Sequence, residues 1–351
     1  MDNIAILIPT FNRHSFLIRQ FDWLNQIGVE EVFALDGSEK RLECPEIFSK
    51  WYHHLPNMPY IERLKYGIDK VKQSMAVLCA DDDYLYPEGL KNAVSFLEKN
   101  ADYSVSYGQY FLVFPYKNRY GIKQLYGCNR SFGIHDNDHT NRLSVWMRDY
   151  MHSFYAPRQS DRMRAIIKSL PSNQETDEKK LGDSEAANLV ELAFAITDAW
   201  FGKRMVSISD IYMVRQAVER NSVILGPDAV EEQYPQQFCS WIDEYCKKFS
   251  EYANTDYSTF RLFWSNGWRE YRDYFIPKYI KKTSKNKQKI NILKSFKKII
   301  FRSIKRTIKK IFPKDSQAKR VLLLFPGIKE IVDHMNNYTN TLVDNGKVNF
   351  F

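Results

Sequence analysis

Three consecutive aspartates, Asp81-Asp82-Asp83, directly follow a short apolar run at residues 75–80. Carboxylates this close together repel one another unless a cation or a strong set of hydrogen-bond donors neutralises them. Mg²⁺ and Mn²⁺ take oxygen ligands and often bridge protein carboxylates to a substrate phosphate. A helix N-cap accounts for one aspartate but not for three. The cluster therefore favours a site that binds a divalent cation together with a phosphate.

The apolar run before the aspartates contains no Gly or Pro and predicts a buried central strand. Residues 4–8 and 32–35 predict two earlier strands, and helical patterns follow at about 17–24 and 61–72. Strands that alternate with helices are typical of βαβ units and a mostly parallel sheet. The predicted fold class is therefore α/β, with a Rossmann-like sheet flanked by helices.

Each predicted strand is followed by polar side chains at its carboxyl end. Thr10 and Asn12 follow the first strand, Asp36 and Ser38 follow the second, and the aspartates follow the third. The carboxyl ends of parallel strands meet at one edge of the sheet, where ligands of open α/β sheets bind. We therefore expect these residues to converge on a single cleft.

Composition and charge narrow the class of protein. The five cysteines form no C-x-x-C pair, which favours reduced thiols and a cytoplasmic location. We expect no signal peptide and no membrane-spanning segment, because the apolar start is cut by Pro9 and no apolar run approaches about 18 residues. The formal net charge of +9 is carried by residues 281–314, which contain no acidic residue. The rest of the chain is mildly acidic.

Three short motifs together resemble a known family. Ile-Leu-Ile-Pro-Thr-Phe-Asn-Arg at residues 6–13, Asp-Gly-Ser at 36–38, and Asp-Asp-Asp followed by Pro87 look like the nucleotide-sugar-binding half of GT-A fold glycosyltransferases of family 2. The resemblance covers roughly residues 4–97 and continues more weakly to about 216. It implies a GT-A fold and a nucleotide-sugar donor, with a UDP-sugar favoured.

The same resemblance implies roles for individual donor-site residues. Pro9, Thr10 and Arg13 would line the base and ribose, and Asp36 would hold the uracil or other base with Ser38 nearby. Asp83 would contact Mn²⁺ or Mg²⁺ directly, Asp81 would contact the metal or ribose, and Asp82 would contact the donor or only shape the turn. Arg63 and Arg215 are the candidate cations for the diphosphate, and the alternatives are a solvated helix face for Arg63 and a surface salt bridge for Arg215.

An inverting transferase also needs a general base near the anomeric carbon. The resemblance places it at the start of a late helix, where Asp183 and Glu185 are the candidates and Glu191 competes with them. The alternative is that Asp183 is an N-cap and Glu185 a first-turn acid. On the acceptor side, Trp146, His152 and Tyr155 are candidates for sugar contacts, although aromatic residues at helical spacing are more often core residues.

Residues 289–312 repeat Ile, Leu and Phe at steps of three and four, with Lys and Arg between them. This composition is typical of a cationic amphipathic helix at an anionic membrane surface. Nucleic acid is disfavoured as the partner, because phosphate binding does not require an apolar stripe. Docking of the stripe on the protein's own core is the third possibility.

The sequence as a whole predicts a metal-dependent, inverting glycosyltransferase on the cytoplasmic face of a membrane. It would extend a surface glycan on a glycan or lipid-linked acceptor. The expected organisation is a catalytic domain at 1–225, a helical module at 226–280, the basic helix at 281–314 and a tail at 315–351. The alternatives are a nucleotidyl- or phosphotransferase, disfavoured because no glycine-rich P-loop appears, and a non-catalytic membrane-associated scaffold.

Overall fold

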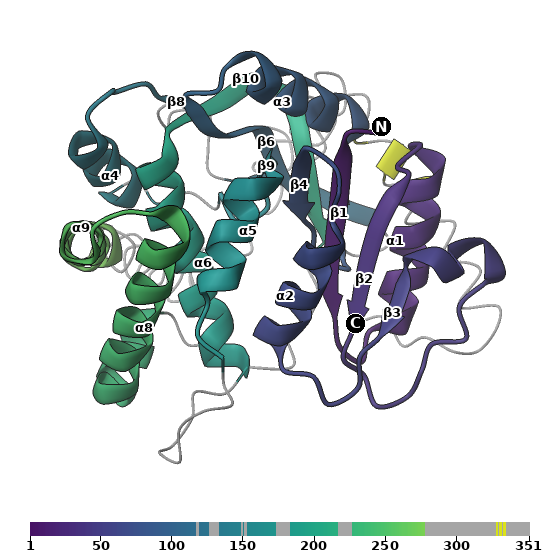
Figure 1. The fold of residues 1–351 in the computed structure, drawn as a ribbon. Coiled ribbons are helices and arrows are strands. Elements are labelled where there is room, and N and C mark those ends of the chain that lie inside the picture. The colour runs from purple at the N-terminus through teal and green to yellow at the C-terminus, as the bar shows by residue number, and fades with distance from the viewer. Residues whose placement is uncertain are drawn as a thin grey trace, which may run out of the picture.

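The computed structural model describes most of the chain, and it confirms the predicted α/β class (Figure 1). A mostly parallel sheet is flanked by helices, and a second sheet and a set of C-terminal helices adjoin it. The basic stretch at 289–312 lies outside the described residues. The described residues are 1–116, 119–125, 133–148, 150, 153–172, 183–216, 227–277, 328, 330, 331, 333 and 334.

The first sheet has five strands in the order β3-β2-β1-β4-β9. β1 pairs in parallel with both β2 and β4, and β9 is the antiparallel edge strand. The predicted apolar runs are its central strands, because a strand covered on both faces must be apolar throughout. The strands span, in sheet order, Tyr52–His54, Glu31–Asp36, Ile4–Thr10, Met75–Leu78 and Arg158–Gln159.

The second sheet runs β5-β10-β6-β7, with β8 also paired to β10. β10 lies parallel to β6 and antiparallel to β5, and Arg215 is the register partner of Asp83. This pairing places Arg215, late in the chain, next to the turn at residues 81–83, which we call the aspartate turn. The strands span Asp83–Leu85 (β5), Lys203–Gln216 (β10), Tyr103–Tyr116 (β6), Arg119–Gln124 (β7) and Gly133–Ile134 (β8).

Helices cover the first sheet and connect its strands. α1 ends before Gly28, whose φ of 72° is the left-handed conformation that glycine adopts without strain. α2 packs on β1 and β2 and also contacts α5. The bounds are His14–Gln26 (α1), Glu46–Trp51 (a 3-10 helix), Tyr60–Lys70 (α2), Pro87–Lys99 (α3), His139–Arg148 (α4), Ser160–Ser169 (α5) and Asp183–Phe201 (α6).

The C-terminal helices pack on α4, α5 and α6 and share their core. α8 contacts α5, α9 contacts α4, and Gly267 approaches Ile196 of α6. The expected boundary near residue 225 lies outside the described residues. These elements span Pro227–Gln233 (α7), Pro235–Ala253 (α8), Tyr257–Glu270 (α9) and the π-helical turn Tyr271–Phe275.

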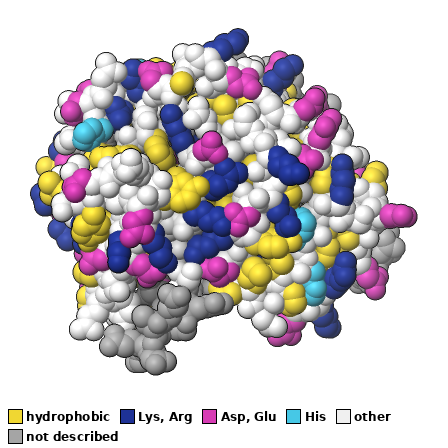
Figure 2. Space-filling model, viewed as in Figure 1, with side chains coloured by type: hydrophobic (Ala, Val, Ile, Leu, Met, Phe, Trp, Pro, Cys, Tyr) yellow, Lys and Arg dark blue, Asp and Glu magenta, His cyan; other side chains and the backbone are white. Residues whose placement is uncertain are grey.

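Basic and acidic side chains alternate over the face formed by α2 and α5 (Figure 2). Lys168 of α5 pairs with Asp69 of α2, and Lys65 of α2 pairs with Glu62 on the same helix. Both signs of charge are interspersed, which is typical of a solvated surface. None of the described helices is long and apolar enough to cross a bilayer.

A short C-terminal piece of the chain packs beside α1 (Figure 1). Ile328 and Ile331 are fully buried. His334 lies 3.1 Å from Asp22 through Nε2, and its ring meets that of Trp23 edge-on. The described residues between 328 and 334 are therefore part of the folded body.

Candidate active site

The loops after β1 and β2 are tied together by main-chain and side-chain hydrogen bonds. The Gly37 amide donates to the Thr10 carbonyl (3.1 Å), and the Asn12 amide donates to Ser38 Oγ (2.7 Å). Asn12 has a φ of 56°, a left-handed conformation that asparagine tolerates better than most residues. These bonds fix the first two strand ends relative to each other.

The aspartate turn after β4 is neutralised by hydrogen-bond donors and arginines from distant segments. Arg13 pairs with Asp81 through Nη1 (2.9 Å) and with Asp82 through Nη2 (2.7 Å). Thr10 Oγ1 donates to the second oxygen of Asp81 (2.6 Å). Arg215 Nε donates to Asp83 Oδ2 (3.0 Å). The structure thus brings the ends of β1, β4 and β10 together at one place.

Two of the three aspartates are buried, and burial dominates their titration. Asp81 is 3% exposed and Asp83 is 1% exposed. Burial raises the pKa of Asp81 to about 6, while Arg13 opposes the shift. Burial also raises the pKa of Asp83 to about 7, against the effect of Arg215 and with the effect of Asp82. Raised carboxyl pKa values in a polar cluster mark this turn as a functional-site candidate.

The aspartate turn is better suited to a cation that is also bound by a substrate phosphate than to a cation bound only by protein side chains. Among the residues that the structure describes, no group of three or more His, Cys, Asp or Glu side chains is placed to hold a metal. Mg²⁺ is commonly held by one or two carboxylates, with substrate phosphates and water completing its shell. Asp81 and Asp83 supply two such carboxylates, so the expected metal ligands are chemically suitable.

Asp36 is fully buried, and the protein itself saturates its carboxylate. Oδ1 accepts from the amide (2.9 Å) and hydroxyl (2.5 Å) of Ser38. Oδ2 lies 2.9 Å from His14 Nε2 and accepts from the Tyr52 hydroxyl (2.7 Å). Burial raises the pKa of Asp36, but these hydrogen bonds outweigh it and hold the pKa below its usual range. A carboxylate has about four acceptor positions, and these contacts occupy them in the ligand-free protein; the expected contact of Asp36 with the base stays a prediction.

Arg63 is buried and holds main-chain segments together by hydrogen bonds; its cationic group is not exposed at the strand ends. Only 4% of it is exposed, and Nη1 donates to the carbonyls of Thr10 (2.7 Å) and Leu35 (2.8 Å). Gly37 lies against the guanidinium so closely that a Cβ there would come within 2.8 Å of it. The expected contact with the diphosphate and the alternative of a solvated helix face are both corrected.

Two of the acceptor-side candidates, Tyr155 and Trp146, lie in different surroundings. The half-buried Tyr155 lies under Arg215, whose guanidinium carbon is 5.4 Å from the ring centre. Trp146 is fully buried and stacks with Arg204 (4.9 Å) in the core, so its expected acceptor contact is corrected. His152 lies outside the described residues.

The candidate bases are spread along α6. Asp183 begins the helix, but its side chain lies outside what the structure describes. Glu185 is half-buried in the first turn, and Glu191 follows about two turns later. Burial raises the pKa of the Tyr155 phenol, and the charges of Glu191 and Asp83 raise it further. The charge of Arg215 opposes this rise in the pKa of Tyr155.

Sequence reasoning missed three side chains beside the strand ends. Phe11, in the loop after β1, is 55% exposed although it is a large apolar residue. His14 directly follows Arg13, and this position next to the first motif is the sequence feature that could have identified it as a site residue. Tyr52 lies on β3, a strand of three residues that was too short to predict.

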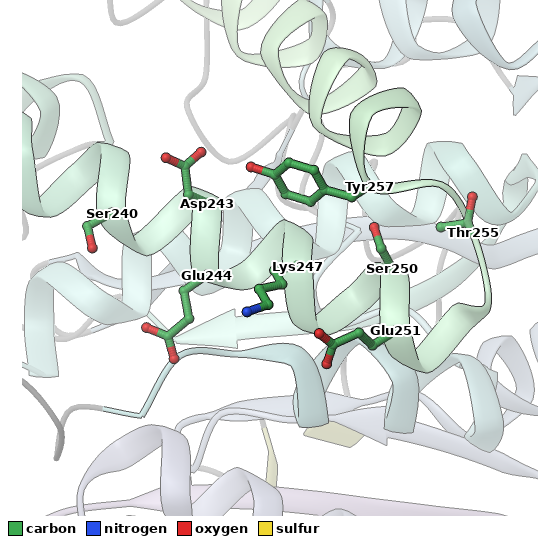
Figure 3. A pocket seen from close by; sticks show the side chains of 8 residues that line it. All are labelled: Ser240, Asp243, Glu244, Lys247, Ser250, Glu251, Thr255 and Tyr257. Carbon is green, nitrogen blue, oxygen red and sulfur yellow. The ribbon is translucent and has the colours of Figure 1, made fainter.

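A separate surface pocket of about 660 Å³ lies on α8 and α9, away from the strand ends (Figure 3). Asp243 in this pocket is paired with Arg261 (2.5 Å), and Glu244 is paired with Lys248. No strand end contributes to it. Its lining residues are Ser240, Asp243, Glu244, Lys247, Ser250, Glu251, Thr255 and Tyr257.

Comparison with known proteins gives a distant structural likeness. No protein-family model and no curated protein sequence matches the chain. Among solved structures, S. aureus TarS 1–349 is similar at 13% identity and a TM-score of 0.48, covering 78% of this chain and 72% of that one. Its complex with UDP-GlcNAc is similar at 13% identity and a TM-score of 0.47 (78% and 73%), and its complex with UDP at 12% and 0.44 (78% and 72%). All three scores are below 0.5.

Proposed function

We propose that the protein is a glycosyltransferase that moves a sugar from a nucleoside-diphosphate donor to a hydroxyl group. The observation that carries this proposal is the meeting of Asp81 and Asp83 with Arg13 and Arg215. It places two buried carboxylates and two arginines at the carboxyl edge of a parallel sheet. Ligands of open α/β sheets bind at that edge.

The two arginines are suited to a diphosphate because each keeps part of its side chain exposed. Arg13 is 35% exposed and Arg215 is 22% exposed, whereas their aspartate partners are almost fully buried. Guanidinium groups bind phosphate oxygens through paired N–H donors. A divalent cation held by Asp83 and Asp81 would supply further neutralisation of the leaving nucleoside diphosphate. The exposed ring of Phe11 offers a surface for stacking of the base.

The chemistry that this site supports is a single displacement. The acceptor oxygen forms a bond to the anomeric carbon, and the bond from that carbon to the diphosphate oxygen breaks. The acceptor proton passes to a carboxylate, for which we propose Glu191, because it lies on α6 and its charge, like that of Asp83, raises the pKa of the Tyr155 phenol. Arg13 and Arg215 would take up the charge on the departing diphosphate. One displacement inverts the configuration at the anomeric carbon.

A donor panel tests this function directly. The full chain is incubated with Mn²⁺ or Mg²⁺ and with individual nucleotide sugars, and the release of nucleoside diphosphate is measured. We expect release from at least one donor, loss of release on adding EDTA, and an inverted sugar product by NMR. Release of inorganic phosphate or transfer of a nucleotidyl group would instead support a phospho- or nucleotidyltransferase. No binding of any nucleotide would contradict the proposal.

We further propose that residues 289–312 attach the protein to the cytoplasmic face of an anionic membrane, where a lipid-linked glycan would be the acceptor. The support is the sequence pattern, since each basic residue near such a surface contributes about 1 kcal/mol. Sedimentation with anionic and with neutral vesicles tests it. We expect binding to anionic vesicles that weakens when four lysines of this segment are changed to Gln. Equal binding by that variant would contradict membrane attachment.

A further inference from the structure

The pocket of about 660 Å³ on α8 and α9 is built on a rigid pair of helices (Figure 3). On the buried side, Tyr245 and Phe249 of α8 stack on each other and contact the rings of Trp264 and Phe260 of α9. The turn between the helices is held by Asn254, whose left-handed φ of 49° ends α8. The pocket is therefore preformed, and its volume is in the range of ligand sites, about 300–1,000 Å³.

Three carboxylates line this pocket, and three cations around it balance their charge. The carboxylates are those of Asp243, Glu244 and Glu251, and the cations are Lys247, Lys248 and Arg261. A nucleotide or a divalent cation would need an excess of one sign of charge. The balance of charges at this pocket therefore favours a neutral ligand.

The ion pairs orient the carboxylates and leave some of their oxygens free. Arg261 Nε donates to Asp243 Oδ1, and Lys248 Nζ donates to Glu244 Oε1. Among the described residues, none donates to the second oxygen of either carboxylate. Figure 3 shows Lys247 in the middle of the pocket, where its ammonium supplies N–H donors. These groups suit a ligand rich in hydroxyls, because a hydroxyl donates to a carboxylate and accepts from an ammonium.

Tyr257 adds an aromatic face to the pocket, and Ser250 adds a buried hydroxyl. Tyr257 begins α9 and is 41% exposed, and Figure 3 shows its hydroxyl directed toward Asp243. Ser250 is 5% exposed, and its Oγ has no hydrogen-bond partner among the described residues. A buried polar group is destabilising when no partner satisfies it. A sugar offers an apolar C–H face for the ring and hydroxyls for the polar groups.

We propose that this pocket binds a neutral sugar unit of a glycan. The sugar ring stacks on Tyr257, and its hydroxyls form hydrogen bonds with Asp243, Glu244 and Lys247. No strand end contributes to the pocket, so it is separate from the proposed donor site. A glycan held here would be the acceptor chain. That role rests on the proposed function, whereas the binding of a sugar does not.

Saturation-transfer NMR on the full chain tests the binding of a sugar. The probes are glucose, galactose, N-acetylglucosamine and N-acetylgalactosamine, each titrated into the millimolar range. We expect at least one of them to bind with a Kd of about 1 mM. Tyr257→Ala should weaken this binding about tenfold, because it removes the stacking face. No binding of any of the four sugars, or equal binding by Tyr257→Ala, would overturn the inference.

Tyr252→Ala is the matched control, because Tyr252 is a tyrosine of α8 that is 50% exposed and does not line the pocket. It should bind the sugar as the wild type does. The same loss of affinity in Tyr252→Ala and Tyr257→Ala would count against the pocket as the binding site.

Ser250→Ala separates binding from folding. Its Tm should not fall, because the variant removes a hydroxyl that has no partner, whereas its affinity for the sugar should fall about threefold or more. A variant that melts earlier and binds the sugar as tightly as the wild type would show that Ser250 serves only the fold, and would count against the site.

The release of nucleoside diphosphate without an added acceptor distinguishes this inference from the proposed function. Tyr257→Ala should release it at the rate of the wild type, because the pocket is separate from the strand ends. If the wild type releases none from any donor, the proposed function fails, and the NMR titrations still decide the inference. Slower release by Tyr257→Ala would contradict a separate sugar site.

Discussion

Arg215 Nε lies 3.0 Å from Asp83 Oδ2, and the two residues are register partners across the antiparallel pair of β10 and β5. They are 132 positions apart in the chain. The pairing means that the charge on the aspartate turn is balanced by the protein before any ligand arrives. It also means that a diphosphate would compete with Asp83 for Arg215, which couples donor binding to the state of this carboxyl group.

Asp83→Asn is expected to stabilise the protein and to abolish most of its activity. Burial raises the pKa of Asp83 to about 7, so the folded state binds this proton more tightly than the unfolded chain, whose carboxyl titrates near pH ~4. Asp83 therefore lowers stability as the pH rises from about 4 to about 7. When thermal unfolding is measured in EDTA, the Tm of the variant minus that of the wild type should increase with pH over that range. Turnover should fall roughly 100-fold or more.

Asp161→Asn is the matched control, since Asp161 on α5 is 95% exposed. It should change neither the pH dependence of unfolding nor turnover. A variant Asp83→Asn that melts below the wild type at neutral pH would contradict the assignment of Asp83 as a destabilising buried carboxylate.

Asp36→Asn is expected to have the opposite effect on stability. Burial raises the pKa of Asp36, but the hydrogen bonds from Ser38, Tyr52 and His14 lower it overall. Ionised Asp36 therefore adds stability above its unfolded pKa of about 4, and this contribution is lost as the pH falls through the lower folded value. The amide would turn a donor toward Ser38 or Tyr52, and we expect a loss of about 2 kcal/mol or more at neutral pH.

Urea unfolding at several pH values measures this loss. The difference between Asp36→Asn and the wild type should be largest at neutral pH and should narrow below about pH 4. A difference that is the same at every pH would show that the ionised state of Asp36 is not what stabilises the loop.

Glu191→Gln is expected to reduce kcat by about 100-fold or more with little change in the KM for the donor. The reason is that Glu191 is the proposed base on α6, and its charge acts on the Tyr155 phenol as that of Asp83 does. Asp183→Asn and Glu185→Gln are the comparison variants. A larger loss of kcat in either of them would show that the general base lies at the start of α6.

Arg13 and Arg63 should respond differently although both are arginines near Thr10. Arg13→Ala removes the partner of Asp81 and Asp82 and a contact for the diphosphate, so the donor KM should rise about tenfold or more. Arg63→Met removes donors to buried carbonyls, so the protein should unfold at lower urea. Donor KM and the urea midpoint, measured on both variants, separate the roles. A normal urea midpoint for Arg63→Met would contradict its bracing role.

The central strands could be predicted because burial on both faces leaves a continuous apolar run. β1, β2 and β4 are such runs, and the convergence of their polar ends follows from parallel pairing alone. β3 and β9 were missed because they have three and two residues, which is too few to show a pattern. β3 matters for the site, because the hydroxyl of its Tyr52 donates one of the hydrogen bonds to the Asp36 carboxylate.

The partners of the aspartates could not be predicted from residue types and spacing. The sequence indicated that the three charges must be balanced, and a cation was the simplest solution. The structure shows Arg13 and Arg215 beside these carboxylates, and the position of Arg215 depends on the register of β10, which residue spacing does not reveal. The divalent cation stays a prediction. Arg63 was misjudged for a similar reason, since helical periodicity does not reveal that its guanidinium reaches main-chain carbonyls.

The packing of Ile328 and Ile331 beside α1 has a consequence for the basic segment that precedes them. The described residues on either side of 278–327, Ile276 and Ile328, both pack on the folded body, so the stretch between them is joined to it at both ends. A tail held at one end would let the body rotate freely above a lipid surface. A segment held at both ends limits that rotation, so membrane attachment would present the strand ends to the bilayer in a restricted set of orientations.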